Sequence, residues 1–199
     1  MNTAKVIVVT GFEPFGGDSY NPSQEVAQSL NGQQLALGKF EVKSFILPVD
    51  TQAAPLQLAE IFEKEQPSAL ISLGLASGRT DISLEQVAVN LKDWTKADNA
   101  GNIKTKEPID PTGPANYPSR LPLTEIKTNL DQQAIPNHLS SDAGLYLCNQ
   151  VMYCALRLID SRHLNIPAGF IHLPATTELE LPIQIQAIKV ALEVTAHSL

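Results

Sequence analysis

The run Lys5-Val6-Ile7-Val8-Val9-Thr10 is β-branched and apolar, and Gly11 closes it. A short apolar run with a turn signal behind it predicts a buried β-strand. Two later runs, Ala69–Leu75 and Ala168–Leu173, have the same apolar character. These runs are spread over most of the chain, so we expect a sheet at the centre of the fold.

Helical signals separate these strands. The residues Asn21-Pro22-Ser23 provide an N-cap followed by proline at the first helical position, and they open a helix to about Leu30. Further helices are expected at residues 53–65, 123–133, 146–160 and 182–196, and further strands at 40–49 and 84–91. This alternation predicts the α/β class, as a three-layer α/β/α sandwich around a mostly parallel, mixed sheet.

One long segment breaks the alternation. Residues 93–122 are rich in proline, asparagine, glycine and lysine, and they show no usable periodicity. A loop of this length in a compact domain is predicted to be functional or mobile. The chain shows no internal repeat and no composition shift, so residues 1–199 are expected to form a single domain.

Charge and composition exclude several classes of protein. A net charge of -7 over 199 residues argues against nucleic acid and anionic membranes as partners, because both need a basic surface. No apolar run approaches the roughly 18 residues that span a bilayer, and the N-terminus shows no signal-peptide pattern. Two cysteines make no disulfide framework, so the predicted compartment is the reducing cytoplasm.

Cys148 is a candidate nucleophile because of its place in the predicted helix. In the first turn, the helix macrodipole and the free backbone N–H groups stabilise a thiolate. The same N–H groups can hold a developing oxyanion. Cys154 lies six residues on, roughly 9 Å along the axis and on another face, so it is interpreted as a core residue. A buried, unreactive thiol is the alternative for Cys148 as well.

His172 is the only histidine in a predicted strand, and Glu85 is the candidate acid beside it. A thiol, an imidazole and a carboxylate that orients the imidazole form the machinery of a cysteine peptidase. In the expected strand 84–91, Glu85 would face the same side as Val87 and Val89. The structural alternatives are a half-buried histidine near the sheet edge and a carboxylate in water. No histidine or cysteine spacing suits a metal, so no metal site is expected.

An ordered set of motifs covers most of the chain. They are Gly11-Phe12-Glu13-Pro14-Phe15-Gly16-Gly17 with Asn21-Pro22-Ser23, Gly78-Arg79-Thr80-Asp81-Ile82 leading to Glu85, Asp98-Asn99-x-Gly101-Asn102, Cys148-Asn149-x-Val151-Met152-Tyr153 and Gly169-Phe170-Ile171-His172-x-Pro174. Together they resemble the signatures of the pyroglutamyl peptidase I (pyrrolidone-carboxylate peptidase) family of cysteine peptidases, of which this chain would be a divergent member.

The resemblance implies a cytoplasmic enzyme that removes N-terminal pyroglutamate (5-oxoproline) from peptides through an acyl-enzyme. It also implies that no cofactor is needed and that the chain forms a homo-oligomer, a tetramer or a dimer. Carried over residue by residue, Cys148 matches the nucleophile and His172 the general base and acid. Glu85 matches the group that orients the histidine.

The same resemblance implies a pocket for the pyroglutamyl ring. Its expected substrate-binding residues are Phe12, Phe15, Asn21, Leu75 and Tyr146. Pyroglutamate is a cyclic lactam with no free ammonium, so the pocket needs apolar walls and a few hydrogen bonds directed at amide groups. A carboxylate there would serve no purpose, and Glu13 is expected to point elsewhere.

Two departures from the family pattern leave alternatives open. Leu75 stands where the family commonly has glutamine, and Thr95 stands where it has an arginine that helps to hold the oxyanion. Only Lys92 and Lys96 lie near Thr95 in the sequence. One alternative is an amidase of the same fold and triad that acts on another lactam or acyl group. The other is a non-catalytic binding protein that retains the ring pocket.

Overall fold

The strand β4 (Ala69–Leu75) lies at the centre of the fold in a computed structural model that describes residues 4–199. On one side it pairs in parallel with β1 (Lys5–Phe12), and on the other with β11 (Ala168–Leu173). These are the three apolar runs of the sequence. Nearly all their residues are buried because helices cover both faces of the sheet, as is usual for parallel sheets.

Within residues 4–199 these strands belong to one sheet of seven strands, in the order β10-β5-β11-β4-β1-β3-β2. The other members are β2 (Gln34–Leu35), β3 (Phe40–Leu47), β5 (Ile82–Glu85) and β10 (Asn137–Ser140). Neighbours run parallel except at the β5–β11 and β2–β3 pairs. The predicted mostly parallel, mixed sheet is confirmed.

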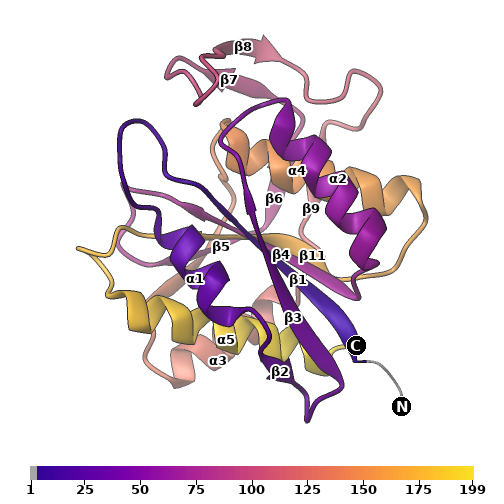
Figure 1. Cartoon of the computed structure of the whole chain (residues 1–199), viewed down its shortest axis with the longest axis vertical. Helices are drawn as coiled ribbons and strands as arrows, with labels where there is room; N and C mark the ends of the chain where they lie inside the picture. The colour runs from indigo at the N-terminus through magenta and orange to yellow at the C-terminus, as the bar shows by residue number, and fades with distance from the viewer. Residues whose placement is uncertain (1–3) are drawn as a thin grey trace.

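Five helices of the described chain cover the two faces of the sheet. They are α1 (Pro22–Leu30), α2 (Ala53–Glu65), α3 (Leu123–Gln132), α4 (Leu147–Ser161) and α5 (Leu181–His197). Figure 1 shows α1, α3 and α5 on one face and α2 and α4 on the other. The three-layer α/β/α sandwich predicted from the sequence is therefore confirmed.

The side chains of β1 show how the sheet divides the core. Ile7 and Val9 pack into the apolar cluster under α1 and α5, while Val8 and Phe12 pack into the cluster under α2 and α4. This follows from the period of a strand, in which successive side chains point to opposite faces. The end of β1 thus delivers Phe12 to the face on which α4 begins.

The expectation of a single strand over residues 84–91 is wrong. The first part is β5, which ends at Glu85, and the second is β6 (Val87–Val89), which pairs with β9 (Asn116–Pro118) in a separate sheet. At Gln86 the chain leaves the main sheet, where the Gln86 N–H donates to the carbonyl oxygen of Ser140. Glu85 therefore does not share a face of one strand with Val87 and Val89.

The segment 93–122 also contains structure that the sequence did not indicate. Besides β9, it carries β8 (Lys104–Glu107), which pairs with β7 (Lys92–Trp94) in a small hairpin at the top of Figure 1. In addition, His138 lies in β10, so His172 is not the only strand histidine. Among residues 4–199, no helix is long and apolar enough to cross a membrane.

Candidate active site

The register of three strands positions His172 next to Glu85. In β11, His172 pairs with Gly74 of β4 on one side and with Ser83 of β5 on the other. Glu85 lies two residues beyond Ser83 and so on the same face, at a diagonal position across the antiparallel pair. The His172 Nδ1 atom lies 2.7 Å from Glu85 Oε1, and both side chains are buried.

Gly74 leaves the space that the sulfur of Cys148 occupies. A Cβ atom built on Gly74 would lie 2.7 Å from Cys148 Sγ and 2.8 Å from the Phe170 ring. Residues that pair directly across two strands face the same side of a sheet. The missing side chain of Gly74 therefore opens a slot beside His172, and the thiol fills it.

Cys148 is the second residue of α4, so it lies in the first helical turn. The first four N–H groups of a helix have no partner within the helix, and the backbone N–H of Cys148 is one of them. The next side chain fixes this turn in place, because Asn149 exchanges two hydrogen bonds with Val89 of β6 and donates a third to the carbonyl oxygen of Leu91. Cys148 thus has the helix position expected from the sequence.

The charges of the buried pair follow from its neighbours. Burial lowers the pKa of His172, but the Cys148 sulfur and the Glu85 carboxylate beside it outweigh this effect and raise the pKa to about 9. Burial raises the pKa of Glu85, and the hydrogen bond and positive charge of His172 more than offset that, leaving the pKa below its usual value. At neutral pH the pair is therefore an imidazolium and a carboxylate.

A cavity of about 180 Å³ opens beside the Cys148 thiol, at the carboxyl ends of β1, β3 and β4. Ligands of open α/β sheets bind at this edge. All five residues expected to bind substrate line this cavity together with Cys148: Phe12, Phe15, Asn21, Leu75 and Tyr146. The five side chains named from the sequence therefore lie together in the fold.

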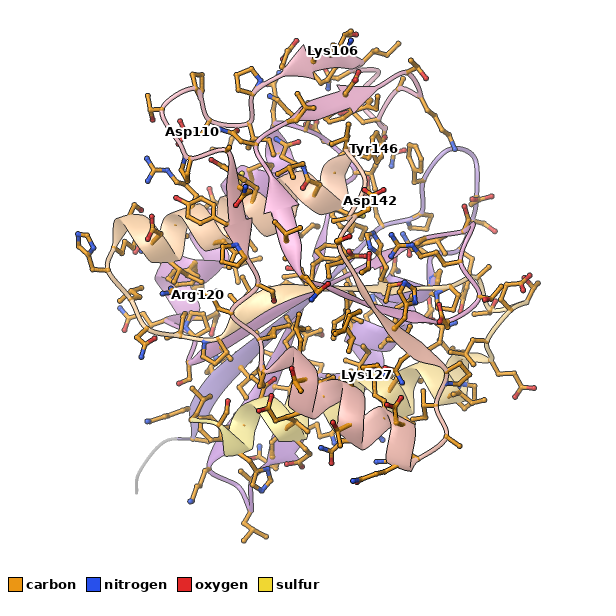
Figure 2. The ribbon with its side chains drawn as sticks, turned by 180° about the vertical axis from the view of Figure 1, so that it is seen from behind. Lys106, Asp110, Arg120, Lys127, Asp142 and Tyr146 are labelled. Atoms are coloured by element: carbon orange, nitrogen blue, oxygen red, sulfur yellow. The ribbon has the colours of Figure 1, made fainter. Side chains whose placement is uncertain are left out.

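The wall around Tyr146 is aromatic. Its ring lies 5.3 Å from the Phe15 ring and 4.9 Å from the Trp94 ring, centroid to centroid, and the Trp94 contact is edge-to-face. Figure 2 shows Tyr146 beside the start of α4, below the hairpin that carries Lys106. Burial raises the pKa of the Tyr146 phenol well above its usual value, so the hydroxyl stays protonated.

Comparison with known proteins gives the family. A family model described as pyroglutamyl peptidase matches residues 5–196. A pyrrolidone-carboxylate peptidase from Oceanobacillus iheyensis is 42% identical over 89% of this chain and 87% of its own length. A second one, from Pyrococcus furiosus, is 38% identical over 97% of this chain and 99% of its own length. The chain belongs to the pyroglutamyl peptidase family.

Solved structures agree with this assignment. A mutant pyrrolidone carboxyl peptidase from Pyrococcus furiosus superposes with a TM-score of 0.93 at 36% identity, covering 97% of this chain and 99% of that one. The enzyme from Thermococcus litoralis gives a TM-score of 0.93 at 34% identity, covering 97% and 94%. This member of the pyroglutamyl peptidase family is accordingly a cysteine peptidase of the pyroglutamyl peptidase I type.

Two side chains of this family member have structural partners that the motifs alone did not reveal. Asn21 accepts a hydrogen bond from the Ser23 N–H and donates one to the carbonyl oxygen of Glu13. The Glu13 carboxylate accepts from the Val49 N–H and the Asn99 side chain, so it points away from the cavity. Asn21 thus both lines the cavity and holds the loop that carries Phe15.

The structure shows what surrounds Thr95, the residue expected to stand in place of the family arginine. Thr95 is exposed on the surface and does not line the cavity, whereas Lys96 does. The Lys96 ammonium lies 4.2 Å from the centroid of the Phe15 ring, a cation–π geometry. A lysine on the neighbouring position thus brings a positive charge to the rim.

Arg79 is a site residue to which the sequence reasoning assigned no role. Its guanidinium contacts Glu85 Oε1 at 2.6 Å, the oxygen that also faces His172. No periodic pattern could have revealed it, because it lies in the loop between β4 and β5. Among residues 4–199, no group of three histidine, cysteine, aspartate or glutamate side chains could hold a metal ion.

Proposed function

We propose that this protein removes N-terminal pyroglutamate from peptides, with Cys148, His172 and Glu85 as its catalytic triad. The observation that carries the proposal is the cavity itself. It is ring-sized, its lining is mostly apolar and aromatic with Asp18 and Lys96 as its charged members, and it opens directly onto the Cys148 thiol. Its volume of about 180 Å³ is below the roughly 300–1,000 Å³ of pockets for drug-sized ligands. That size suits one small ring better than a length of peptide.

The chemistry follows from the charges of the buried groups. The Cys148 thiolate attacks the carbonyl carbon between pyroglutamate and the next residue, and the backbone N–H groups at the start of α4 hold the oxyanion. The His172 imidazolium gives its proton to the leaving amine as the C–N bond breaks. A water molecule, deprotonated by the now neutral His172, then attacks the thioester, which releases pyroglutamate and restores the Cys148 thiolate and the His172 imidazolium. Glu85 holds the imidazole in orientation throughout.

Lys96 is proposed to supply part of the charge that the family arginine gives to the oxyanion. Its position over Phe15 places a cation at the cavity rim. Lysine is a point charge without the planar fork of arginine, so this replacement is incomplete and the enzyme is expected to be weak. We further propose that the protein acts as a homo-oligomer in the cytoplasm, where its free thiols Cys148 and Cys154 stay reduced.

The test is hydrolysis of a fluorogenic pyroglutamyl amide. Wild type is expected to hydrolyse it, and Cys148→Ser should lower turnover by at least about 10⁴-fold with folding intact. Cys154→Ser is the matched control and should keep full activity. Iodoacetamide should label Cys148 first, because burial raises the pKa of Cys154 to about 12.

Other substrates separate the alternatives. Turnover of prolyl amides, or of amides of a lactam other than pyroglutamate, in preference to the pyroglutamyl amide would indicate an amidase of different specificity, and Leu75 is the side chain to examine in that case. An unreactive Cys148 with binding of pyroglutamate but no turnover would identify a binding protein. Either result would overturn the proposed function.

A further inference from the structure

Arg79 joins two parts of the candidate active site. Ser140 also lies between them, because it pairs with Glu85 in the β5–β10 register and its hydroxyl exchanges hydrogen bonds with the Asp142 backbone. One nitrogen of Arg79, Nη1, lies 2.6 Å from Glu85 Oε1. The other, Nη2, donates a hydrogen bond to the backbone carbonyl oxygen of Asp142. The first contact is to the acid beside His172, and the second is to the segment that leads into α4.

The contact with Glu85 is important because one carboxylate oxygen carries both interactions. Glu85 is fully buried, and its Oε1 atom faces both Arg79 and His172 Nδ1. The other oxygen, Oε2, is buried without a hydrogen-bond partner among the described residues. Removing the guanidinium would leave the buried carboxylate with His172 as its one cationic partner among the described residues, and losing a charged partner is costly for an ion in a low-dielectric site.

The contact with Asp142 bears on the nucleophile. Asp142 accepts a hydrogen bond from the Gly144 N–H at 2.9 Å, and Gly144 adopts a positive φ of 73°. This turn brings the chain to Tyr146 and then to Cys148 in the first turn of α4. Figure 2 shows Asp142 and Tyr146 following each other along this segment. Arg79 therefore fixes the acid of the triad and the approach to the nucleophile with one planar group.

We propose that Arg79 is a positioning residue that holds the Glu85 carboxylate in the orientation that aligns His172 with Cys148. This inference rests on the proposed function of the triad. The fork of an arginine can hold two oxygens at a fixed angle, which a lysine cannot do. Arg79 also offsets part of the negative charge that Glu85 presents to His172, and this keeps the proton of the imidazolium transferable.

The charged groups around this centre can be named. His172 is faced by Glu85 from β5 and by Cys148 from α4, and Glu85 is faced in addition by Arg79. Asp81 and His138 form their own pair on the β5 and β10 side, with His138 Nδ1 2.9 Å from the Asp81 carboxylate. Within the described chain, Arg79 and His172 are thus the two cations that contact the buried Glu85 carboxylate.

The first experiment compares Arg79→Gln with Arg157→Gln. Arg157 is exposed to a similar extent as Arg79, and it forms an ion pair with the partly exposed Asp110 away from the cavity. In Arg79→Gln, kcat should fall about 10- to 100-fold with little change in KM. The basic limb of the pH profile should move to higher pH, because Glu85 then holds the His172 proton more tightly. Arg79→Lys should restore only part of kcat. Equal kcat values for the two glutamine variants would overturn the proposal.

A double variant tests whether Arg79 acts through Glu85. In a Glu85→Gln background, Arg79→Gln should change kcat by no more than about 2-fold. An undiminished loss in that background would show a purely structural role and would also overturn the proposal.

A measurement without substrate separates this inference from the proposed function. The pH dependence of Cys148 alkylation by iodoacetamide, followed in a Cys154→Ser background, should move to higher pH in Arg79→Gln. If wild type does not hydrolyse pyroglutamyl amides but alkylation shifts, only the proposed function fails. If wild type hydrolyses them and neither kcat nor alkylation responds to Arg79→Gln, only the role of Arg79 fails.

Discussion

At the scale of single residues, the candidate site depends on Gly74, which has no side chain. Gly74 pairs with His172 and leaves the slot for the Cys148 sulfur. Gly74→Ala would place a methyl group 2.7 Å from that sulfur, so the thiol of Cys148, the proposed nucleophile, would have to move. A misplacement of about 1 Å can cost on the order of 10²-fold in rate, and we expect kcat of Gly74→Ala to fall by about that factor.

Gly78→Ala is the control for this prediction, because nothing lies within 4 Å of a Cβ atom at Gly78 and its φ is not positive. Its kcat should stay within about 2-fold of wild type. Steady-state hydrolysis and the rate of Cys148 alkylation would be measured for both variants. Wild-type rates in Gly74→Ala would mean that the thiol is not held by this slot.

At the scale of elements, the N-terminus of α1 supports both the fold and the cavity. Asn21 caps the helix through the Ser23 N–H and holds the Glu13 carbonyl through its amide nitrogen. Asn21→Ala should lose about 1–2 kcal/mol of stability. Asn21→Ser should lose much less, because serine is also a good N-cap. Both variants lose the contact with the loop that carries Phe15, so KM should rise in both.

Urea unfolding and KM for the pyroglutamyl amide would be measured side by side for these two variants. The serine variant separates the two roles of Asn21, since it keeps the cap but not the tether to Glu13. An unchanged KM in both variants would show that Asn21 is a helix cap only and plays no part in the cavity.

The bounds of individual helices and strands were predicted correctly where a local sequence pattern determines them. Helix 53–65 and strands Ala69–Leu75 and Ala168–Leu173 have the predicted bounds. An amphipathic pattern defines the helix, and continuous apolar runs define the two strands. The break at Gln86 was not predicted, although two consecutive polar residues, Glu85 and Gln86, interrupt the alternation of residues 84–91 there. What changes there is the pairing partner, from β11 and β10 to β9, and that choice depends on distant residues.

In the candidate site, too, some features follow from the local sequence and others depend on residues far apart in the chain. Cys148 could be found from its place at a helix start, and His172 from its apolar strand. Their meeting depends on strand register and on Gly74, which no local pattern specifies. Arg79 lies in the loop between β4 and β5, outside any periodic pattern, and its contact with Glu85 is visible only in the structure.

At the scale of the whole molecule, one buried carboxylate ties together segments that are far apart in the sequence. Asp98 accepts hydrogen bonds from the backbone N–H groups of Thr51, Ala100 and Asn102. Thr51 in turn exchanges hydrogen bonds with the side chain of Gln150 in α4. The turn before α2, the loop after β7 and the helix α4 are therefore held together through Asp98.

This arrangement predicts an acid-sensitive contribution to stability. Burial raises the pKa of Asp98, but the N–H groups of Thr51 and Asn102 that donate to it leave the pKa below its ordinary value of 3.8. A group whose pKa is lowered in the folded state stabilises it above the unfolded pKa, and that stabilisation is lost as the pH falls through the folded pKa. The contribution of Asp98 should thus be complete at neutral pH and should disappear below about pH 3.8.

Asp98→Asn tests this prediction because the amide cannot titrate and offers only one acceptor oxygen. At pH 7 the variant should be about 1–3 kcal/mol less stable than wild type, since the Thr51 N–H loses its acceptor. Urea unfolding at decreasing pH should show this difference shrinking as Asp98 of wild type becomes protonated. Asp18→Asn, an exposed carboxylate, is the control and should track wild type at every pH. A difference for Asp98→Asn that stays constant with pH would show that the ionised carboxylate is not what holds these segments together.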